Sequence, residues 1–254
     1  MELLVRFLSE PSAPRTMVIV WAVVMICVPI TRWVLGEGAE RIGIATGVFA
    51  QVAAVVVTIA GSFGAFTIAV VILVPLLGWT SEVIGWRTGF PFGKYAYTDV
   101  LQPQVAGVPV LIPLAWLMMM PPAWAVGHLV SPDRPVVAWI VAAAAFTAWD
   151  VYLDPQMVSW RFWKWERNGV YLGIPLSNYA GWFAVSFVIT AFVATIGGGS
   201  AVFDARAASG LATIYAVTWV LQFIGQFVFW KMRVAAVAGF VAMGIFVVAM
   251  IAIA

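Results

Sequence analysis

Charged residues are scarce in this 254-residue chain, and so are cysteine and histidine. Asp, Glu, Lys and Arg make up 9% of it, whereas 64% is hydrophobic. Soluble domains are near a quarter charged, so a chain this apolar requires the bilayer as its solvent. One cysteine, Cys27, excludes an intrachain disulfide. The lone His128 is expected on the side of the membrane opposite the acids, and neither a Ser–His–Asp set nor a Cys/His metal cluster is visible in the sequence. The net charge of +2 is too small to indicate a nucleic-acid partner.

What the chain does contain is a series of apolar runs long enough to cross a membrane as helices. The strand alternation of an outer-membrane barrel is not visible. The sequence therefore predicts an all-α, polytopic membrane bundle, a single domain over residues 1–254. It has eight spans, or seven if one of the last two lies flat. The runs cover residues 16–35, 42–60, 65–84, 109–127, 136–153, 179–196, 211–230 and 234–253.

Pro155 predicts where the fifth span ends. The residue before a proline avoids helical geometry, so this helix is expected to stop at Asp154. Residues 156–167 are rich in Trp, Arg and Lys and are followed by Asn168 and Gly169. This composition predicts a short helix that lies in the membrane interface.

Lys and Arg predict the orientation of the bundle. With eight spans, nine of the 13 fall on the side of the two long loops, 87–108 and 154–179. That side is therefore expected to be cytoplasmic, with both termini outside. Because the third and fifth spans end on this side, its acidic and amide side chains are expected to converge in one leaflet. They are Glu82, Asp99, Asp150, Asp154 and Asn178.

Asp150 and Asp154 stand at the end of the fifth span, in the aromatic-rich stretch 146–182. Four residues apart, they lie on one face of a helix, and two carboxylates this close do not both ionise easily. One of them is therefore a candidate general acid. Two alternatives stay open. The pair can bond local backbone or pair with Arg161 and Lys164, or, as a DxxxD motif, it can hold magnesium and a diphosphate.

Further candidates surround this pair. Glu82, at the end of the third span, is a second candidate catalytic carboxyl group; the alternative is that it pairs with Arg87. The loop residue Asp99 is a third candidate. Asn178 can orient a water molecule or cap the sixth span. Aromatic side chains can bind a polyene and stabilise a carbocation with their ring faces, or they can form an interfacial belt. These aromatics are Trp86, Tyr95, Tyr97, Trp149, Tyr152, Trp160 and Tyr179.

Two long motifs resemble a known family. They are SEVIGWRTGFPFGKYAYTD (81–99) and WDVYLDPQMVSWRFWKWERNGVYLGIPLSNYAGW (149–182). In their eight-span frame they are similar to the CruF-type hydratases of membrane carotenoid biosynthesis, over most of residues 65–195. The resemblance implies water addition across the terminal double bond of an acyclic carotenoid end, which gives a tertiary alcohol. It implies no redox cofactor.

The residues and the resemblance together predict a carotenoid 1,2-hydratase of the cell membrane, with no cofactor and no metal. Protonation by a buried carboxyl would give a tertiary carbocation, which water then attacks. Asp150, one turn deeper than Asp154, is the expected donor, with Glu82 as its rival. The expected partners of the protein are an acyclic carotenoid in the bilayer, membrane lipid and other membrane enzymes of the pathway. The alternatives are an acid-initiated cyclase, an intramembrane prenyltransferase, or a non-catalytic carotenoid or lipid carrier.

Overall fold

The computed structural model describes residues 12–253, without the side chains of residues 32, 37–41 and 200. This part of the chain is mostly helical, which confirms the prediction of an all-α membrane bundle. Its α-helices are α2 (Ala13–Leu35), α3 (Glu37–Phe63), α4 (Phe66–Thr88), α5 (Leu111–Val130), α6 (Pro135–Ser159), α7 (Leu176–Gly197), α8 (Ala205–Ile224) and α9 (Arg233–Ile253). Its short elements are β1 (Tyr95–Tyr97), β2 (Gln104–Val105), β3 (Val108–Pro109), β4 (Trp163–Trp165), the 3-10 turn η1 (Gly198–Ser200) and the π-helical turn η2 (Gly225–Phe229).

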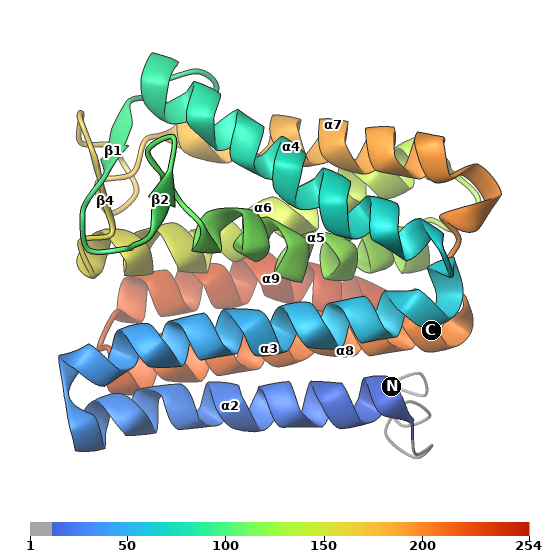
Figure 1. Cartoon of the computed structure of the whole chain (residues 1–254), viewed down its shortest axis with the longest axis horizontal. Helices are drawn as coiled ribbons and strands as arrows, with labels where there is room; N and C mark the ends of the chain where they lie inside the picture. The colour runs from blue at the N-terminus through green and yellow to red at the C-terminus, as the bar shows by residue number, and fades with distance from the viewer. Residues whose placement is uncertain (1–11, 254) are drawn as a thin grey trace.

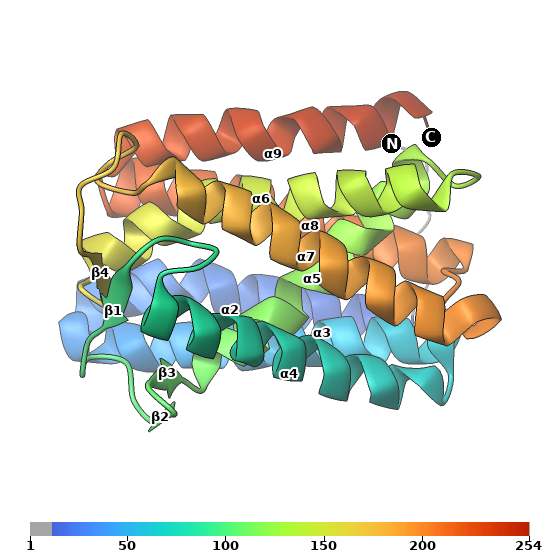
Figure 2. The same ribbon diagram turned by 90° about the horizontal axis from the view of Figure 1, so that it is seen from above.

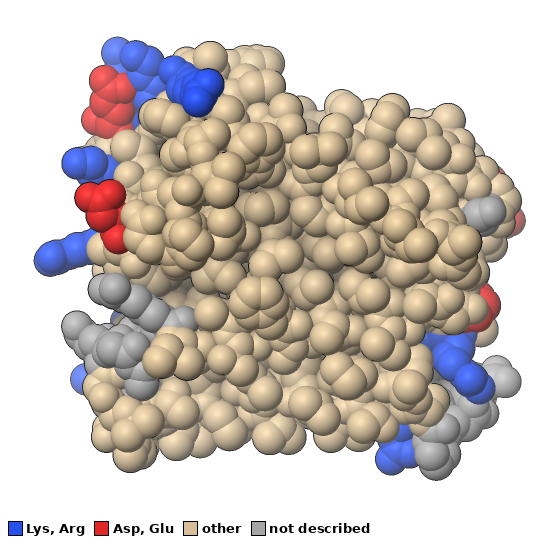
Figure 3. All heavy atoms as spheres, viewed as in Figure 1, with Lys and Arg blue, Asp and Glu red and all other residues tan. Residues whose placement is uncertain are grey.

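The outer surface of the bundle is apolar along its length. Large apolar side chains are exposed there, among them Ile68 and Ile72 on α4 and Val241, Ile245 and Val248 on α9. Charged side chains gather at the two ends of the face shown in Figure 3. Within the described residues, seven helices are long and apolar enough to cross a membrane. The chain is therefore a multi-pass membrane protein.

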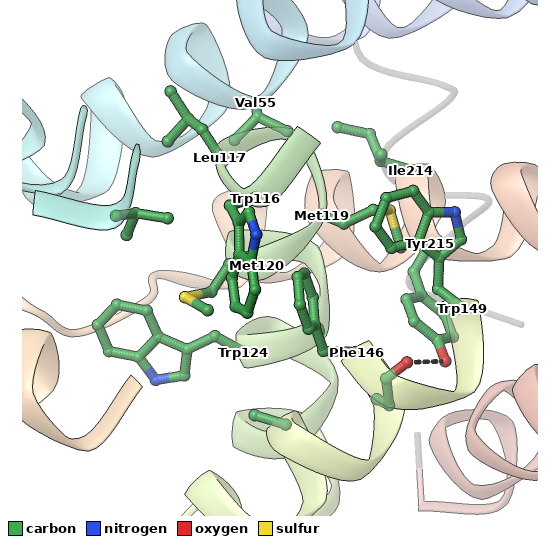
Figure 4. Packing of buried hydrophobic residues seen from close by; sticks show 14 of the residues in the cluster. Val55, Trp116, Leu117, Met119, Met120, Trp124, Phe146, Trp149, Ile214 and Tyr215 are labelled. Carbon is green, nitrogen blue, oxygen red and sulfur yellow. Dashed lines mark hydrogen bonds between the residues drawn. The ribbon is translucent and has the colours of Figure 1, made fainter. Parts of the chain in front are cut away.

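The remaining helix, α5, runs through the centre of the bundle (Figure 1). It packs against α3, α4, α6, α8 and α9, and 12 of its 20 residues are buried. Because α5 is surrounded by protein, it does not need the uniformly apolar surface of a helix that faces lipid. It carries Trp116 and Trp124 and, besides Pro113 in its first turn, the interior prolines Pro121 and Pro122. Figure 4 shows Trp116 packed among Met120 and Phe146 in this core.

The predicted end of the fifth span at Asp154 is wrong, because α6 continues through Pro155 to Ser159. A proline inside a helix leaves the carbonyl four residues earlier without its donor. Here that carbonyl belongs to Val151, and the hydroxyl of Tyr171 donates to it at 3.1 Å. A side chain from a distant loop thus replaces the missing backbone bond, and the helix can continue.

The predicted interfacial helix over residues 156–167 is also wrong. After α6 ends, β4 pairs antiparallel with β1, with Tyr95 opposite Trp165 and Tyr97 opposite Trp163. The opposed rings pack together, at centroid distances of 5.2 Å and 5.8 Å. The strand period of two puts both Trp rings on one face and the exposed Lys164 on the other.

This small ribbon closes one end of the bundle (Figure 1 and Figure 2). The beginning of α2 and the end of α9 both lie at the opposite end, because α5 traverses the bundle in addition to the seven span-length helices. The ribbon joins the two long loops that follow α4 and α6. The ribbon of β1 and β4 therefore covers the C-terminal ends of α4 and α6 and the N-terminal end of α7.

Candidate active site

Asp150 and Asp154 lie on one face of α6, both buried, as their spacing predicts. Asn178, at the start of α7, joins them. Its amide nitrogen Nδ2 donates to Oδ2 of Asp150 at 2.7 Å and to Oδ2 of Asp154 at 2.8 Å. Arg161 and Lys164 are exposed, and among the described residues neither forms an ion pair with Asp150 or Asp154. Within the described part of the chain, the aspartates are therefore held by an amide and not by a cation.

The two aspartates differ in their remaining oxygens. Oδ1 of Asp154 accepts a hydrogen bond from Nε1 of Trp163 at 2.5 Å. Oδ1 of Asp150 is buried and has no hydrogen-bond partner among the described residues. An ionised carboxylate only accepts hydrogen bonds, whereas a protonated one carries an O–H of its own. Both oxygens of Asp154 thus accept hydrogen bonds, as those of an ionised carboxylate do, while Asp150 has one oxygen free to carry a proton.

A third carboxyl group, that of Glu82 on α4, is buried nearby. Its Oε2 accepts from the hydroxyls of Tyr95 at 2.5 Å and Tyr97 at 2.8 Å, and its Oε1 accepts from Nε1 of Trp116 at 3.3 Å. Burial raises the pKa of both tyrosines, and the charge of Glu82 raises it further, so both stay protonated donors near neutral pH. Three donors on one carboxyl group stabilise its ionised form and offset part of the cost of burying a charge there.

Aromatic rings hold the Trp116 donor in place. Trp116 stacks on Trp182 of α7 with centroids 4.8 Å apart, and Phe146 packs against both. On the other side, Gly78 of α4 leaves room for the indole, because a Cβ there would lie 2.6 Å from Cγ of Trp116. The glycine and the stacked rings fix the direction in which the indole N–H points.

The carboxyl groups of Glu82, Asp150 and Asp154 and the amide of Asn178 line one small cavity, which we call the acid cavity. Its volume is about 30 Å³, enough for a water molecule, which needs roughly 10–15 Å³ by this measure. Its remaining wall is aromatic and aliphatic, and within the described residues no Lys or Arg lines it. The cavity therefore combines acidic groups, ring faces and room for water.

A second cavity adjoins the first, and we call it the glutamine cavity because Gln51, Gln156 and Gln222 line it. Its volume is about 100 Å³, and most of its wall is apolar. Four residues belong to the walls of both cavities: Ile112, Ala115, Leu153 and Trp163. The glutamine cavity extends to α2 and α3, so it offers apolar space next to the acids.

The structure divides the predicted aromatic residues into three groups. Tyr95 and Tyr97 line the acid cavity, and Trp149 and Trp160 line the glutamine cavity. The others line neither cavity. Trp86 bonds to the carbonyl of Ala106, Tyr152 turns to the carbonyl of Trp219 on α8, and Tyr179 packs its ring on Tyr171.

Asp99 is the one predicted acid that the structure does not bring to the cluster. Its side chain is exposed in the turn after β1. The convergence predicted for the acids and the amide therefore holds for Glu82, Asp150, Asp154 and Asn178.

The sequence did not single out Trp116, Trp163, Trp182, Gln156 or Gln222. The alternation of Trp163 and Trp165 in WRFWKW is a strand signal that could have placed Trp163 beside Tyr97. Gln156 and Gln222 stand out as amides in apolar surroundings. No local signal marks Trp116, because its role depends on packing between three helices.

Among the described residues, no group of three His, Cys, Asp or Glu side chains is arranged to hold a metal ion. A second acidic motif facing Asp150 and Asp154 is likewise absent from this part of the chain. Intramembrane prenyltransferases present two such motifs to magnesium and diphosphate.

Comparisons with known proteins agree with this geometry. No solved structure matches the chain. The bisanhydrobacterioruberin hydratase of Haloarcula japonica is 32% identical to it over 111 residues, which are 42% of this chain and 38% of that protein. The model of the family described as carotenoid biosynthesis protein matches residues 42–250. That match covers all helices from α4 to α8 and both motifs that carry the resemblance, and so the chain belongs to the carotenoid biosynthesis protein family.

Proposed function

We propose that this protein is a hydratase that adds water across the terminal double bond of an acyclic carotenoid end. The observation that carries the proposal is the unpaired Oδ1 of Asp150 beside a buried cavity of water size. The name of the Haloarcula relative, a hydratase, supports the same reaction. The substrate would reach the site from the bilayer, through the apolar space of the glutamine cavity.

In the proposed mechanism, Asp150 transfers its proton to the less substituted carbon of the double bond. The positive charge then lies on the tertiary carbon, where ionised Glu82 and the ring faces stabilise it. A water molecule, placed by Asn178, forms the new C–O bond and loses its proton to Asp154. Transfer of that proton from Asp154 back to Asp150 restores the site. The net change is the addition of one water.

A cyclase would begin with the same protonation but would have to keep water away from the cation. The acid cavity has room for water next to three carboxyl groups and an amide, which favours hydration over ring closure. A prenyltransferase would need a second acidic motif, and the described residues lack it. A carrier would not need an unpaired carboxyl oxygen in its core.

The function is tested by making the protein in cells that accumulate acyclic carotenoids and weighing the pigments. We expect a product heavier by one water. An unchanged mass with a new ring would instead identify a cyclase, and bound pigment without product would identify a carrier. Activity in detergent is expected to survive a chelator. Loss with EDTA and rescue by magnesium would support the transferase.

We also propose that the site faces the cytoplasm, with the protein in the cell membrane. The nine-to-four distribution of Lys and Arg supports this orientation. With Cys27 replaced by Ser, cysteines at Lys94 and Arg167, both exposed beside the ribbon, should be protected from membrane-impermeant thiol reagents in intact cells. A cysteine at Arg134, exposed at the opposite end, should be labelled. The reverse pattern would invert the orientation.

A further inference from the structure

Hydration needs two reactants, and the acid cavity must admit both of them. In the proposed function the polyene arrives through the glutamine cavity, whose wall is mostly apolar. A hydrocarbon chain in that space leaves little room for water and offers it no hydrogen-bond partner. The water is therefore expected to come from another side of the acid cavity.

An open cleft lies at the end of the bundle that the ribbon closes, and we call it the end cleft. It is lined by residues from the segments 88–94, 166–167 and 175–177, and its volume is about 520 Å³. Lys94, Glu166 and Arg167 belong to its wall and are exposed. Charged side chains gather at this end of the bundle in Figure 3. Among the described residues, the end cleft shares no lining residue with the glutamine cavity, so it is a separate opening with a charged rim.

A thin wall separates the end cleft from the acid cavity. In four places one residue lines the end cleft while its neighbour in sequence lines the acid cavity. Three of these pairs are Lys94 and Tyr95, Glu166 and Trp165, and Ser177 and Asn178. Oγ of Ser177 holds the wall together by donating to the carbonyl of Phe92 at 3.0 Å. Water in the end cleft is therefore separated from the acids by a single layer of residues.

The indole of Trp165 fills part of this wall. Its benzene ring borders Gly93 of the end cleft, because a Cβ on Gly93 would lie 3.5 Å from Cζ3 of Trp165. Gly93 has a φ of +107°, which favours glycine, and a Cβ there would also lie 3.0 Å from Oγ of Ser177. On its other side, Trp165 packs on Tyr95, with centroids 5.2 Å apart, and lines the acid cavity. One side chain thus reaches from the end cleft to the acid cavity.

Nε1 of Trp165 is buried and has no hydrogen-bond partner among the described residues. Trp163, two residues earlier on the same face of β4, donates to Asp154, whereas Trp165 lies near Asp154 without making this bond. A buried N–H without an acceptor is costly. A water molecule in the acid cavity can accept from Nε1 of Trp165 and donate to a carboxylate. Such a water would satisfy the indole and lie next to the acids.

We propose that the water added to the double bond enters the acid cavity from the end cleft, past Trp165, and that the N–H of Trp165 binds it on arrival. The carotenoid and the water then have separate routes, so a bound polyene does not block the water. The indole also closes the wall to nucleophiles larger than water. This inference rests on the proposed function and deepens it by assigning the route and the first binding group of the second substrate.

Methanol, which is one carbon larger than water, tests this route as a competing nucleophile. The protein in detergent is given an acyclic carotenoid in buffer that contains methanol, and water gives the alcohol. Attack by the oxygen of methanol on the carbocation, with loss of the methanol proton to Asp154, gives a methyl ether that is heavier than the substrate by one methanol. The ratio of ether to alcohol, measured by mass, therefore reports which nucleophile reaches the acid cavity.

Trp165→Ala removes the indole from the wall and should raise this ratio at least about 10-fold, because an enzyme pocket can discriminate by that factor for one carbon. Trp165→Phe, which keeps a ring against Tyr95, should raise it less. Trp160→Ala is the matched control, because it truncates a tryptophan of the glutamine cavity. It should leave the ratio unchanged, whatever its effect on total turnover. Carotenoid that co-purifies shows that each variant is folded.

Thiol adducts separate the route from the size of the acid cavity. Two further variants carry Trp165→Ala and Cys27→Ser, together with either Arg167→Cys in the end cleft or Lys164→Cys on the outer face of the ribbon. Both positions are exposed and basic, so the two variants are matched. A bulky maleimide at position 167 should lower the ratio of ether to alcohol, and the same reagent at position 164 should not.

A ratio that stays at the wild-type value in both Trp165 variants would overturn the proposal, and Trp165→Phe decides alone if Trp165→Ala does not fold. A rise in Trp160→Ala alone would also overturn it and would place the water route in the glutamine cavity. Equal effects of the two adducts would do the same to the end cleft as the entrance. A wild-type protein that forms neither alcohol nor ether would refute the proposed function and the route with it, whereas alcohol without any change of ratio would refute the route alone.

Discussion

Replacing Asp150 by Asn is expected to abolish hydration while the carotenoid still binds. The amide has nearly the same shape as the carboxyl group but has no acidic proton to transfer. Protonation by a placed acid contributes roughly 10²–10⁴ in rate, and in the proposed mechanism Asp150 is the group that donates this proton. We therefore expect turnover to fall by at least about 100-fold. Pigment mass in producing cells measures turnover, and co-purified pigment measures binding.

Two further substitutions make this result specific. Asp154→Asn should reduce turnover less, because its oxygens act as acceptors for Asn178 and Trp163 and an amide oxygen can still hold a water molecule. Asp99→Asn, an exposed change at the same end of the bundle, should leave turnover unchanged. Near-normal turnover in Asp150→Asn would remove Asp150 from the donor role. That role would then pass to Glu82 or Asp154.

The helices of this fold could be predicted from sequence because the bilayer requires long apolar segments with internal hydrogen bonds. One exception comes from a contact between distant segments, and another has a local cause. Pro155 does not end α6, because Tyr171 supplies the donor that the proline lacks. The start of α8 was missed for a local reason. Asp204 caps that helix by accepting from the backbone of Ala207 at 2.7 Å, so it begins before the apolar run does.

The part of the candidate site that could be predicted from sequence is its carboxyl groups, because each of them is unusual in a membrane helix by itself. Carboxyl groups in membrane helices are costly enough to indicate a role, and this argument pointed to Asp150, Asp154 and Glu82. The difference between the two aspartates was expected from depth alone. In the structure it also depends on Trp163, a partner that becomes visible once β4 is known to pair with β1. Strands of three residues are too short to predict reliably from a pattern.

Glu82 is expected to act on the carbocation rather than on the proton. Its oxygens already accept from Tyr95, Tyr97 and Trp116, and these three donors stabilise the negative charge of the ionised form. Glu82→Gln keeps the shape and removes the charge, so turnover should fall by about 100-fold or more. Tyr97→Phe, which removes one of the three donors and keeps the charge, should have a smaller effect. Both effects are measured as pigment turnover.

The roles of Glu82 and Asp150 can be separated with a carotenoid-like amine whose ammonium group replaces the tertiary cationic carbon. Such an analogue of the charged intermediate binds through the negative charge that stabilises it. Glu82→Gln should weaken its binding at least about 10-fold, equivalent to about 1.4 kcal/mol. Asp150→Asn should change it little, because a protonated aspartic acid and an asparagine are both neutral. If Asp150→Asn weakened binding and Glu82→Gln did not, the two roles would have to be exchanged.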